Sequence, residues 1–240
     1  MTLHTYGTEF NCASAEEVVP SILKIVPAGT LVDVGCGLGT WTRVFRDHGL
    51  KVLGLDGDHV PRERLCIPES EFLVSDLRFP NGSPNLGLYD LCISLEVAEH
   101  LPPECAERLI SFLCDCSDVV VFSAAIPGQT GENHLNEQPL EYWASKFEDR
   151  GYVVLDPFRA NNWQNPRIEW WYRQNMLLAV SNTRADEFAN CRRFDRNTYV
   201  HPECLEMYRN MQVTKSVVSQ LIQRLHYCLT LQFLRRQRKQ

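Results

Sequence analysis

Apolar residues in this chain gather in short runs that are separated by longer segments of mixed character. Several runs are apolar on both faces, which predicts strands buried on both sides, as in a parallel sheet covered by helices. Seven runs are expected to form strands: 31–34, 51–55, 71–75, 89–95, 119–126, 152–155 and 175–180.

Between these runs, apolar residues recur at intervals of three and four, which is the period of an amphipathic helix. One helix is expected after Ser14, because Ser14 and Glu17 have the spacing of a capping box, and Pro27 ends it. Two others are expected at 40–48 and 104–113. Because strands and helices alternate, the chain predicts an α/β fold with a doubly wound, seven-stranded, mostly parallel, Rossmann-like sheet.

The end of the chain follows a different pattern. From Val213 to Phe233, apolar residues recur every three to four positions, which predicts one long amphipathic helix. We therefore expect one domain over residues 1–182, including the first helix, and a C-terminal helical extension over residues 183–240. The apolar face of this helix packs on its own domain, forms the contact of a homodimer, or covers a substrate as a lid. The pattern leaves these three arrangements open.

Charge and cysteine content restrict the partners and the compartment. The formal net charge of −6 argues against the broad basic surface of a general nucleic-acid binder. The ten cysteines include no CxxC pair and several lie within apolar runs, which is typical of a reducing cytosol, so a cytoplasmic location is expected. No apolar stretch has the length of a membrane span, and residues 1–11 lack the apolar run of a signal peptide.

A glycine-rich turn follows the first predicted strand. The strand ends at Asp33-Val34 and continues into Gly35, Gly37 and Gly39 before the helix at 40–48. Glycines permit a sharp strand-to-helix turn and let a ligand approach the backbone closely. The fingerprint of a dinucleotide site requires glycine or alanine at the position of Thr40, so the spacing favours a different ligand.

Two further carboxylates stand at strand ends. Asp56 ends the second predicted strand and Asp76 the third. The carboxyl ends of parallel strands form the edge at which open α/β folds bind ligands. A carboxylate at Asp56 can accept hydrogen bonds from both hydroxyls of a ribose, and one at Asp76 from an adenine amino group. The alternative is that both side chains only cap loops.

Four segments carry a resemblance to class I S-adenosylmethionine-dependent methyltransferases. LVDVGCGLGTWTRVF resembles their first motif, VLGLDGD and FLVSDL resemble the ends of their second and third strands, and YDLCISLEVAEHLP resembles their fourth strand and the loop after it. The resemblance is close over residues 29–126 and looser to about residue 180. It implies the methyltransferase version of the fold and an S-adenosylmethionine cofactor.

By resemblance, Asp33 and the loop glycines hold the methionine part, Asp56 the ribose and Asp76 the adenine. The full set of implied cofactor residues is Asp33, Gly35, Cys36, Gly37, Gly39, Trp41, Asp56, Gly57, Asp76, Leu77, Leu95 and Glu96.

A second group of polar residues follows the fourth predicted strand. Glu96, Glu99 and His100 have i, i+3, i+4 spacing, and a single helical turn would direct all three to one side. With His134, they form a set of carboxylates and imidazoles that can bind a divalent cation. The set is similar to the ExxEH and distal His of magnesium-dependent small-RNA 2′-O-methyltransferases and of quinone-pathway O-methyltransferases. This resemblance implies that Mg²⁺ or another divalent cation holds the acceptor oxygens. Two alternatives stay open: His100 is a base without a metal, with Glu96 touching the cofactor, or the group is structural.

The expected reaction is methyl transfer to the oxygen of a small molecule or sugar, with Glu99, His100 and His134 as catalytic residues. Acceptor recognition is expected in residues 127–143 and 161–173. The alternatives are N-methylation of a small amine, RNA 2′-O-methylation, and a binding module without catalysis. A small-molecule acceptor and no membrane partner are expected, and the net charge disfavours nucleic acid.

Overall fold

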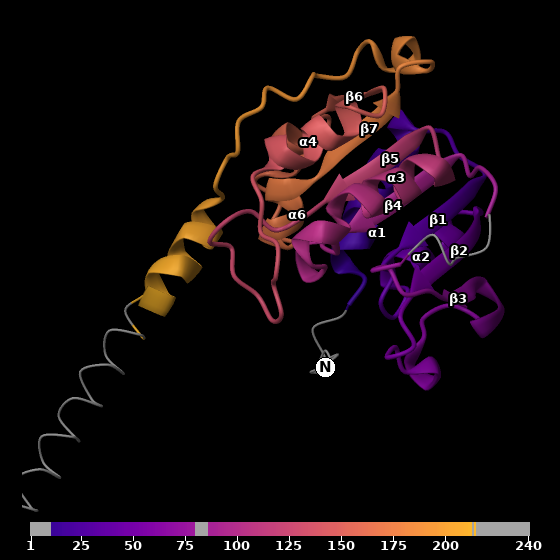
Figure 1. Cartoon of the computed structure of the whole chain (residues 1–240), viewed down its shortest axis with the longest axis horizontal. Helices are drawn as coiled ribbons and strands as arrows, with labels where there is room; N and C mark the ends of the chain where they lie inside the picture. The colour runs from indigo at the N-terminus through magenta and orange to yellow at the C-terminus, as the bar shows by residue number, and fades with distance from the viewer. Residues whose placement is uncertain (1–10, 80–85, 213, 215–240) are drawn as a thin grey trace, which may run out of the picture. The chain divides into compact units, whose positions relative to one another are not determined.

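The computed structural model of the chain describes residues 11–79, 86–212 and 214. These residues fall into two compact units, one that extends to His201 and one that begins at Pro202. The first unit contains the sheet and is shown in Figure 1.

A single seven-stranded sheet forms the centre of the first unit, with strand order β3-β2-β1-β4-β5-β7-β6. Neighbouring strands are parallel from β3 through to β5, and β7 is antiparallel to both of its neighbours. This confirms the predicted doubly wound, mostly parallel sheet. The strands are β1 (Thr30–Val34), β2 (Lys51–Asp56), β3 (Phe72–Val74), β4 (Leu91–Leu95), β5 (Val119–Ser123), β6 (Tyr152–Leu155) and β7 (Leu177–Ser181).

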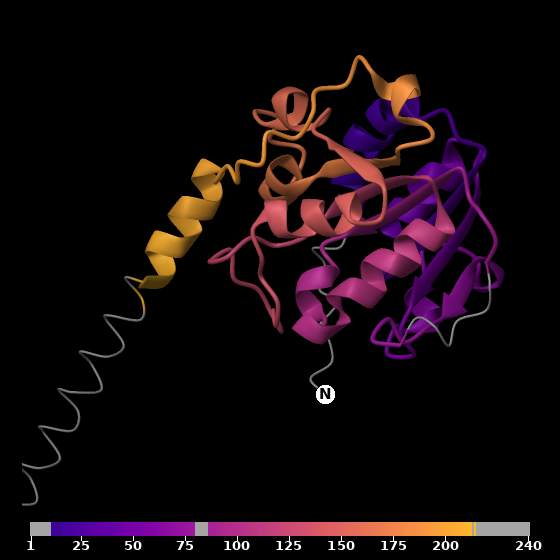
Figure 2. The same ribbon diagram turned by 45° about the horizontal axis from the view of Figure 1, so that its top comes forward.

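Helices cover both faces of this sheet (Figure 2). Alternate residues of β4 show why its sequence is apolar throughout: Cys92 packs in the core beneath α3 and α4, whereas Leu91 and Ile93 pack with α1 and α2 on the other face. Burial on both faces therefore explains the unbroken apolar runs. The helices are α1 (Ala13–Ile25), α2 (Thr40–Asp47), α3 (Ala106–Cys116), α4 (Leu140–Glu148), α5 (Arg159–Asn162) and α6 (Trp170–Asn175).

The first helix starts earlier than predicted. It begins at Ala13, whose backbone N–H donates to the side chain of Asn11 at 2.8 Å, and no side-chain capping bond is made by the residue at its N-cap. Ser14 lies inside the helix, and its hydroxyl accepts a hydrogen bond from the N–H of Glu169 at 2.9 Å. The predicted capping box is therefore wrong, because a contact distant in sequence occupies the Ser14 hydroxyl.

The segment after β7 belongs with the sheet up to His201, whereas the sequence-based boundary was placed after residue 182. Backbone bonds explain the difference: Phe194 N–H donates to Val154 at 3.0 Å, and Asp156 N–H donates to Arg192 at 2.8 Å. These bonds hold residues 192–194 alongside β6.

The second unit is helical over residues 202–212. The apolar repeat from Val213 to Phe233 lies, apart from residue 214, outside the described residues, so its packing, its dimer contact and its role as a lid stay predictions. Among the helices of the described ranges, none is long and apolar enough to cross a membrane.

Candidate active site

The glycine-rich turn lies between β1 and α2, beside the point where the strand order of the sheet reverses. Its three glycines have positive φ angles of 84° at Gly35, 55° at Gly37 and 76° at Gly39, a region that side-chain-bearing residues rarely adopt. A Cβ atom on Gly35 would lie 2.4 Å from Cγ2 of Val97, in the loop after β4. Glycine is therefore required here for conformation and for the close approach of these two loops.

Asp56 holds this turn in place from the end of β2. Its carboxylate accepts hydrogen bonds from the backbone N–H of Gly37 at 2.7 Å and of Gly57 at 2.6 Å. His59 Nε2 lies 3.7 Å from the same carboxylate. Each carboxylate oxygen has a second lone pair, so Asp56 can still accept hydrogen bonds from ligand hydroxyls.

Asp33 lies beneath the turn and not on its surface. Its side chain is buried and accepts a hydrogen bond from the Thr42 hydroxyl at 2.6 Å, which joins β1 to α2. Burial raises the pKa of Asp33 to about 7. The structure thus places Asp33 as a support of the turn, and its predicted link to the methionine amino group through water or backbone stays a prediction.

Asp76, at the far side of this edge, is exposed. Its carboxylate is paired with Arg78, whose Nε and Nη2 lie 2.9 and 2.7 Å from its two oxygens. The hydrogen bonds from Arg78 lower the pKa of Asp76. A ligand that binds Asp76 must share it with this guanidinium, whereas the adjacent Leu77 is buried and can present only its backbone.

Other residues of the predicted cofactor set pack inside the protein. Burial raises the pKa of the Cys36 thiol well above its usual range, and its Sγ atom would lie 2.7 Å from a Cβ on Gly54. Trp41 is buried on α2 and donates from Nε1 to the Tyr172 hydroxyl on α6 at 3.2 Å. Leu95 is buried at the end of β4. Cys36 and Trp41 therefore pack inside the protein, the first within the glycine-rich turn and the second just after it in sequence.

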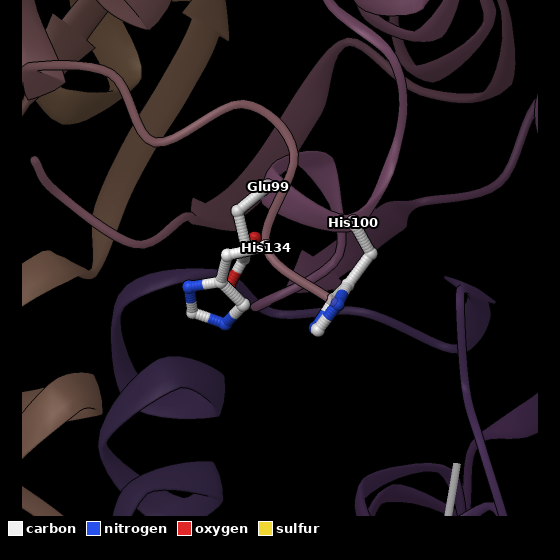
Figure 3. A group of neighbouring side chains, drawn as sticks. All are labelled: Glu99, His100 and His134. Atoms are coloured by element: carbon white, nitrogen blue, oxygen red, sulfur yellow. The ribbon is translucent and has the colours of Figure 1, made fainter. Parts of the chain in front are cut away.

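Three of the four predicted metal ligands come together beyond β4 and β5. Glu99 and His100 lie on a single 3₁₀ turn, Ala98–His100, and His134 lies in the loop between β5 and α4. One ligand atom of each lies within 4.8 Å of the others (Figure 3). The two imidazole rings meet edge to face, with centroids 4.9 Å apart. One carboxylate and two imidazoles thus lie close enough together to bind a single divalent cation.

Glu99 is the unusual member of this group. Its side chain is fully buried, and its carboxylate oxygens make no well-formed hydrogen bond within the described residues, although the Ala125 backbone and the Glu96 carboxyl lie beside it. Burial, and then the charge on Glu96, raise its pKa well above the usual range. A buried carboxyl without a partner is destabilising, and such groups are rare in folded proteins. A bound cation would supply the missing partner.

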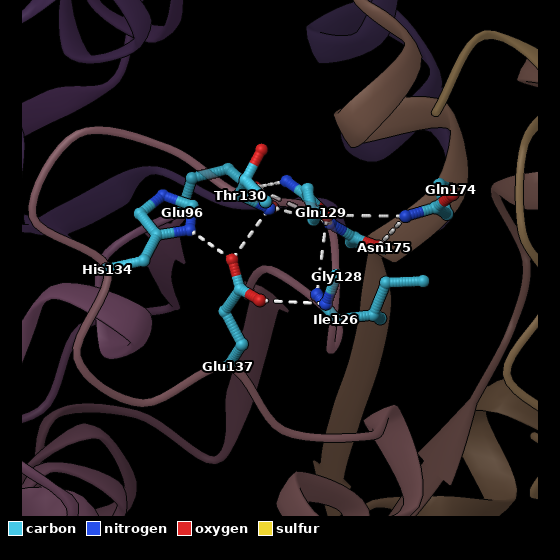
Figure 4. Close-up of polar contacts among 9 residues, drawn as sticks. All are labelled: Glu96, Ile126, Gly128, Gln129, Thr130, His134, Glu137, Gln174 and Asn175. Atoms are coloured by element: carbon cyan, nitrogen blue, oxygen red, sulfur yellow. Dashed lines mark hydrogen bonds and ion pairs between the residues drawn. The ribbon is translucent and has the colours of Figure 1, made fainter. Parts of the chain in front are cut away.

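Glu96 is not one of the three clustered ligands, although its carboxyl lies close enough to Glu99 to raise the pKa of that group, and side-chain amides bind it (Figure 4). Its oxygens accept hydrogen bonds from Gln129 Nε2 at 2.9 Å and from Asn175 Nδ2 at 3.1 Å. Its own φ of 55° lies in the left-handed region, so residues 96–100 do not form the single helical turn that was predicted. Burial nevertheless raises the pKa of Glu96. Asn175 also donates to Gln129 at 2.9 Å and accepts from Gln174 at 2.9 Å, so the amides form one buried network.

Four polar residues around the site were not predicted from the sequence: Gln129, Glu137, Gln174 and Asn175. Residues 127–143 were expected to recognise the acceptor, but no motif distinguished Gln129 or Glu137 within them. The apolar run at 175–180 predicts Asn175 as the first residue of a strand, whereas Asn175 ends α6. The available signal was the Gln174-Asn175 pair directly before an apolar strand, a place where buried amides require partners.

Comparisons with known proteins agree with this geometry. Residues 9–193 match the family described as methyltransferase domain. The sphingolipid C9-methyltransferase of Candida albicans is 27% identical over 177 residues, which cover 67% of this chain and 28% of that protein. The 2-methyl-6-phytyl-1,4-hydroquinone methyltransferase of Synechocystis is 29% identical over 133 residues, which cover 50% of this chain and 38% of that protein. The chain thus spans about a third of the length of these curated relatives.

Solved structures share the fold at low sequence identity. Magnesium protoporphyrin IX methyltransferase from Synechocystis, with bound S-adenosylmethionine, superposes with a TM-score of 0.51 at 20% identity over 70% of this chain and 80% of that one. DesVI from Streptomyces venezuelae gives 0.53 at 14% identity over 71% and 91%. With the family match over most of the chain, these findings confirm the predicted relationship: the chain belongs to the class I S-adenosylmethionine-dependent methyltransferases.

Proposed function

We propose that this protein transfers the methyl group of S-adenosylmethionine to a small-molecule acceptor, and that the acceptor atom is a hydroxyl oxygen. The family match supports the donor. The names of the two curated relatives, a sphingolipid and a hydroquinone methyltransferase, support a small-molecule or lipid acceptor. The choice of oxygen depends on the group formed by Glu99, His100 and His134, and the net charge of −6 favours a small molecule over nucleic acid.

The donor fits the edge formed by β1, β2 and β3. The turn at Gly35 and Gly37 offers a close approach to backbone, which suits the methionine part. Asp56 is already oriented by Gly37 and Gly57 and is proposed to accept from the ribose hydroxyls. Asp76 and the backbone of Leu77 are proposed to bind the adenine.

In the proposed reaction, a lone pair of the acceptor oxygen forms a bond to the methyl carbon while the carbon–sulfur bond breaks. The bonding pair moves to sulfur, which becomes a neutral thioether, and the hydroxyl proton leaves to a base. The chain must hold the two reactants in line and keep water out. Where no cation occupies their ring nitrogens, His100 and His134 are the residues positioned to receive or relay the proton; with a cation bound, the proton of the held hydroxyl would leave to water.

The single observation that carries the acceptor side is the buried carboxyl of Glu99, which makes no well-formed hydrogen bond, beside two imidazoles. One carboxylate and two imidazoles fit a divalent cation such as Mn²⁺, since Mg²⁺ prefers oxygen ligands. When bound, such a cation supplies charge that holds an acceptor hydroxyl and lowers its pKa. Three protein ligands leave coordination positions for an acceptor.

A metal-free base is the second candidate, and one contact favours it. His134 Nδ1 lies 2.8 Å from the Glu137 carboxylate, an arrangement that would orient His134 as a general base. This candidate predicts full transfer in EDTA. The cation candidate predicts transfer that EDTA abolishes and Mn²⁺ restores.

The experiment uses the full chain stripped with EDTA. Thermal shift with S-adenosylhomocysteine, and with NAD as control, tests the donor site, because a ligand of the native state must raise the melting temperature. Release of S-adenosylhomocysteine from a panel of small hydroxyl acceptors, with and without Mn²⁺, then tests the acceptor side. No stabilisation by saturating S-adenosylhomocysteine would contradict the proposal, and equal transfer with and without EDTA would contradict its cation.

A further inference from the structure

The loop between β5 and α4 is held in an unfavourable backbone conformation. It carries His134, and three of its residues have left-handed φ angles: 85° at Gly128, 57° at Thr130 and 60° at Asn133. Left-handed conformations at residues other than glycine cost free energy and persist only where surrounding contacts enforce them. Some group must therefore hold this loop.

Glu137 is that group (Figure 4). Its Oε2 accepts a hydrogen bond from Gly128 N–H at 2.8 Å, and its Oε1 accepts from Thr130 N–H at 2.7 Å. The same Oε1 lies 2.8 Å from Nδ1 of His134. One carboxylate, only 19% exposed, thus joins both ends of the loop to the imidazole.

These bonds determine which ring nitrogen of His134 carries a proton. A carboxylate that accepts from two backbone N–H groups is itself only an acceptor, so His134 Nδ1 must be the donor in its contact with Glu137. In the neutral ring, Nε2 then carries the lone pair. The ring also lies against Gly131, where a Cβ atom would be 2.2 Å from Nε2, so the loop backbone restricts the ring from that side.

We propose that Glu137 is a positioning residue that presents the Nε2 lone pair of His134 to a divalent cation shared with Glu99 and His100. The inference deepens the proposed function and rests on its cation site. Carboxylates that accept from the second nitrogen of a metal-binding histidine fix its orientation and raise its basicity, and their loss weakens metal affinity about 10–100-fold.

The first test measures Mn²⁺ binding by electron paramagnetic resonance on the full chain, without donor or acceptor. Glu137→Gln is expected to bind Mn²⁺ about 10–100-fold more weakly than wild type. Glu137→Asp, which keeps the charge at a shorter reach, is expected to recover part of that affinity. Glu141→Gln, an equal charge change at an exposed position of α4, is the matched control and is expected to bind as wild type.

A double-mutant comparison separates positioning from general damage to the loop. If Glu137 acts through His134, then His134→Ala with Glu137→Gln binds Mn²⁺ no more weakly than His134→Ala alone. Thermal shift with S-adenosylhomocysteine is expected to be unchanged in Glu137→Gln, which shows that the donor side stays folded. Additive losses in the double variant would overturn the positioning role.

Nitrogen NMR of the His134 ring supplies a readout that does not need the metal. Wild type is expected to show protonation at Nδ1 only, and Glu137→Gln a mixture of the two ring forms. Wild-type affinity for Mn²⁺ in Glu137→Gln, with the ring form unchanged, would overturn the inference alone. A wild-type protein that binds no Mn²⁺ would overturn the cation site and this inference together, so the two failures are distinguishable.

Discussion

Two regions of the site differ in how they bind a carboxylate: the ends of β1 and β2, proposed as the donor side, and the ends of β4 and β5, proposed as the acceptor side. Backbone N–H groups bind the carboxylate of Asp56 on the first side, whereas side-chain amides bind that of Glu96 on the second. On the donor side, Asp56 is bonded to Gly37 and to its own neighbour Gly57. On the acceptor side, Glu96 is bonded to Gln129 and Asn175, which are 33 and 79 positions away in sequence. A backbone donor does not depend on the side chain of its residue, whereas Gln129 and Asn175 must keep their amide groups to bind Glu96.

The two sides also differ in how fully their charges are partnered. Asp56 stabilises the turn that it contacts, while Glu99 is buried without a hydrogen bond in the described residues. A group that costs stability and yet faces two histidines is typical of a functional site. The donor side is therefore built before a ligand binds, whereas the acceptor side lacks one partner.

The largest effect is expected for Glu99→Gln, which removes the buried carboxyl of the acceptor side. We expect methyl transfer to fall about 10²–10⁴-fold, the usual contribution of a group that manages the acceptor proton. The melting temperature of the variant without ligands should not fall, because Gln keeps the volume of the buried side chain, removes its ionisable carboxyl and loses no well-formed hydrogen bond. Release of S-adenosylhomocysteine measures the first effect and thermal unfolding the second. Transfer within threefold of wild type would remove Glu99 from the chemistry.

Asp33 tests the donor side through pH. Its folded pKa of about 7 lies above the usual carboxyl value of 3.8, so the folded state favours the protonated form. The unfolded chain releases this proton near pH 4, so the contribution of Asp33 to stability is complete at low pH and is lost as pH rises to 7.

Relative to wild type, Asp33→Asn should therefore gain stability between pH 4 and pH 8, by up to about 4 kcal/mol at about 1.4 kcal/mol for each pKa unit. Urea unfolding of both proteins across this range gives the difference. Asp58→Asn, at an exposed position, serves as the control with no such trend. A difference that stays constant with pH would show that Asp33 is ionised in the folded protein.

Asp56→Ala should weaken S-adenosylhomocysteine binding about 10–100-fold, because charged hydrogen bonds contribute about 1.5–3 kcal/mol. The turn also loses its bond to Gly37, so part of the effect arises from the loop. Isothermal titration calorimetry measures the affinity, with Asp58→Ala as the neighbouring control. Unchanged affinity in Asp56→Ala would place the ribose elsewhere.

The sequence predicted the placement of the residues proposed for the donor side, because the signals for that placement are local. Gly35 and Gly37 stand directly after a strand, and Asp56 ends the next strand, so the fold alone brings them to one edge. Their presence at that edge requires only that the strands be found. Burial of Asp33 was not predictable, because Thr42 and the packing of α2 determine it.

The acceptor side was predicted only in part, for the same physical reason. Glu99, His100 and His134 were identified by residue type, and the structure brings them together. Glu96 was grouped with them by spacing, but its left-handed backbone breaks the predicted helical turn and its carboxylate lies outside the three-ligand cluster, which no local pattern predicts. The amides that hold it, Gln129 and Asn175, come from two other loops and meet only in the folded chain.

Gln129→Leu tests whether the amide network supports the acceptor side alone, because it removes the amide at the centre of that network. Glu96, Gln174 and Asn175 each lose one hydrogen bond and each keep another, so at about 0.5–1.5 kcal/mol for each lost bond the three losses together cost about 1.5–4.5 kcal/mol. We expect the free energy of unfolding to fall by about that amount and methyl transfer to fall as well, with S-adenosylhomocysteine affinity nearly unchanged. Gln164→Leu, at an exposed position, is the control. A large loss of donor affinity would show that the network supports both sides.

The smallest effect is expected at Arg78, where the donor side is exposed. Arg78 pairs with Asp76 at the surface, and exposed pairs contribute about 0–1 kcal/mol, so Arg78→Ala should change the free energy of unfolding by about 0.5 kcal/mol at most. If Asp76 binds the adenine, removal of the competing guanidinium should raise S-adenosylhomocysteine affinity slightly, about two- to threefold. Calorimetry measures the affinity of Arg78→Ala and of Asp76→Ala for S-adenosylhomocysteine. A loss of affinity in Arg78→Ala would mean that the guanidinium itself contacts the donor. Unchanged affinity in Asp76→Ala would mean that backbone groups alone bind the adenine.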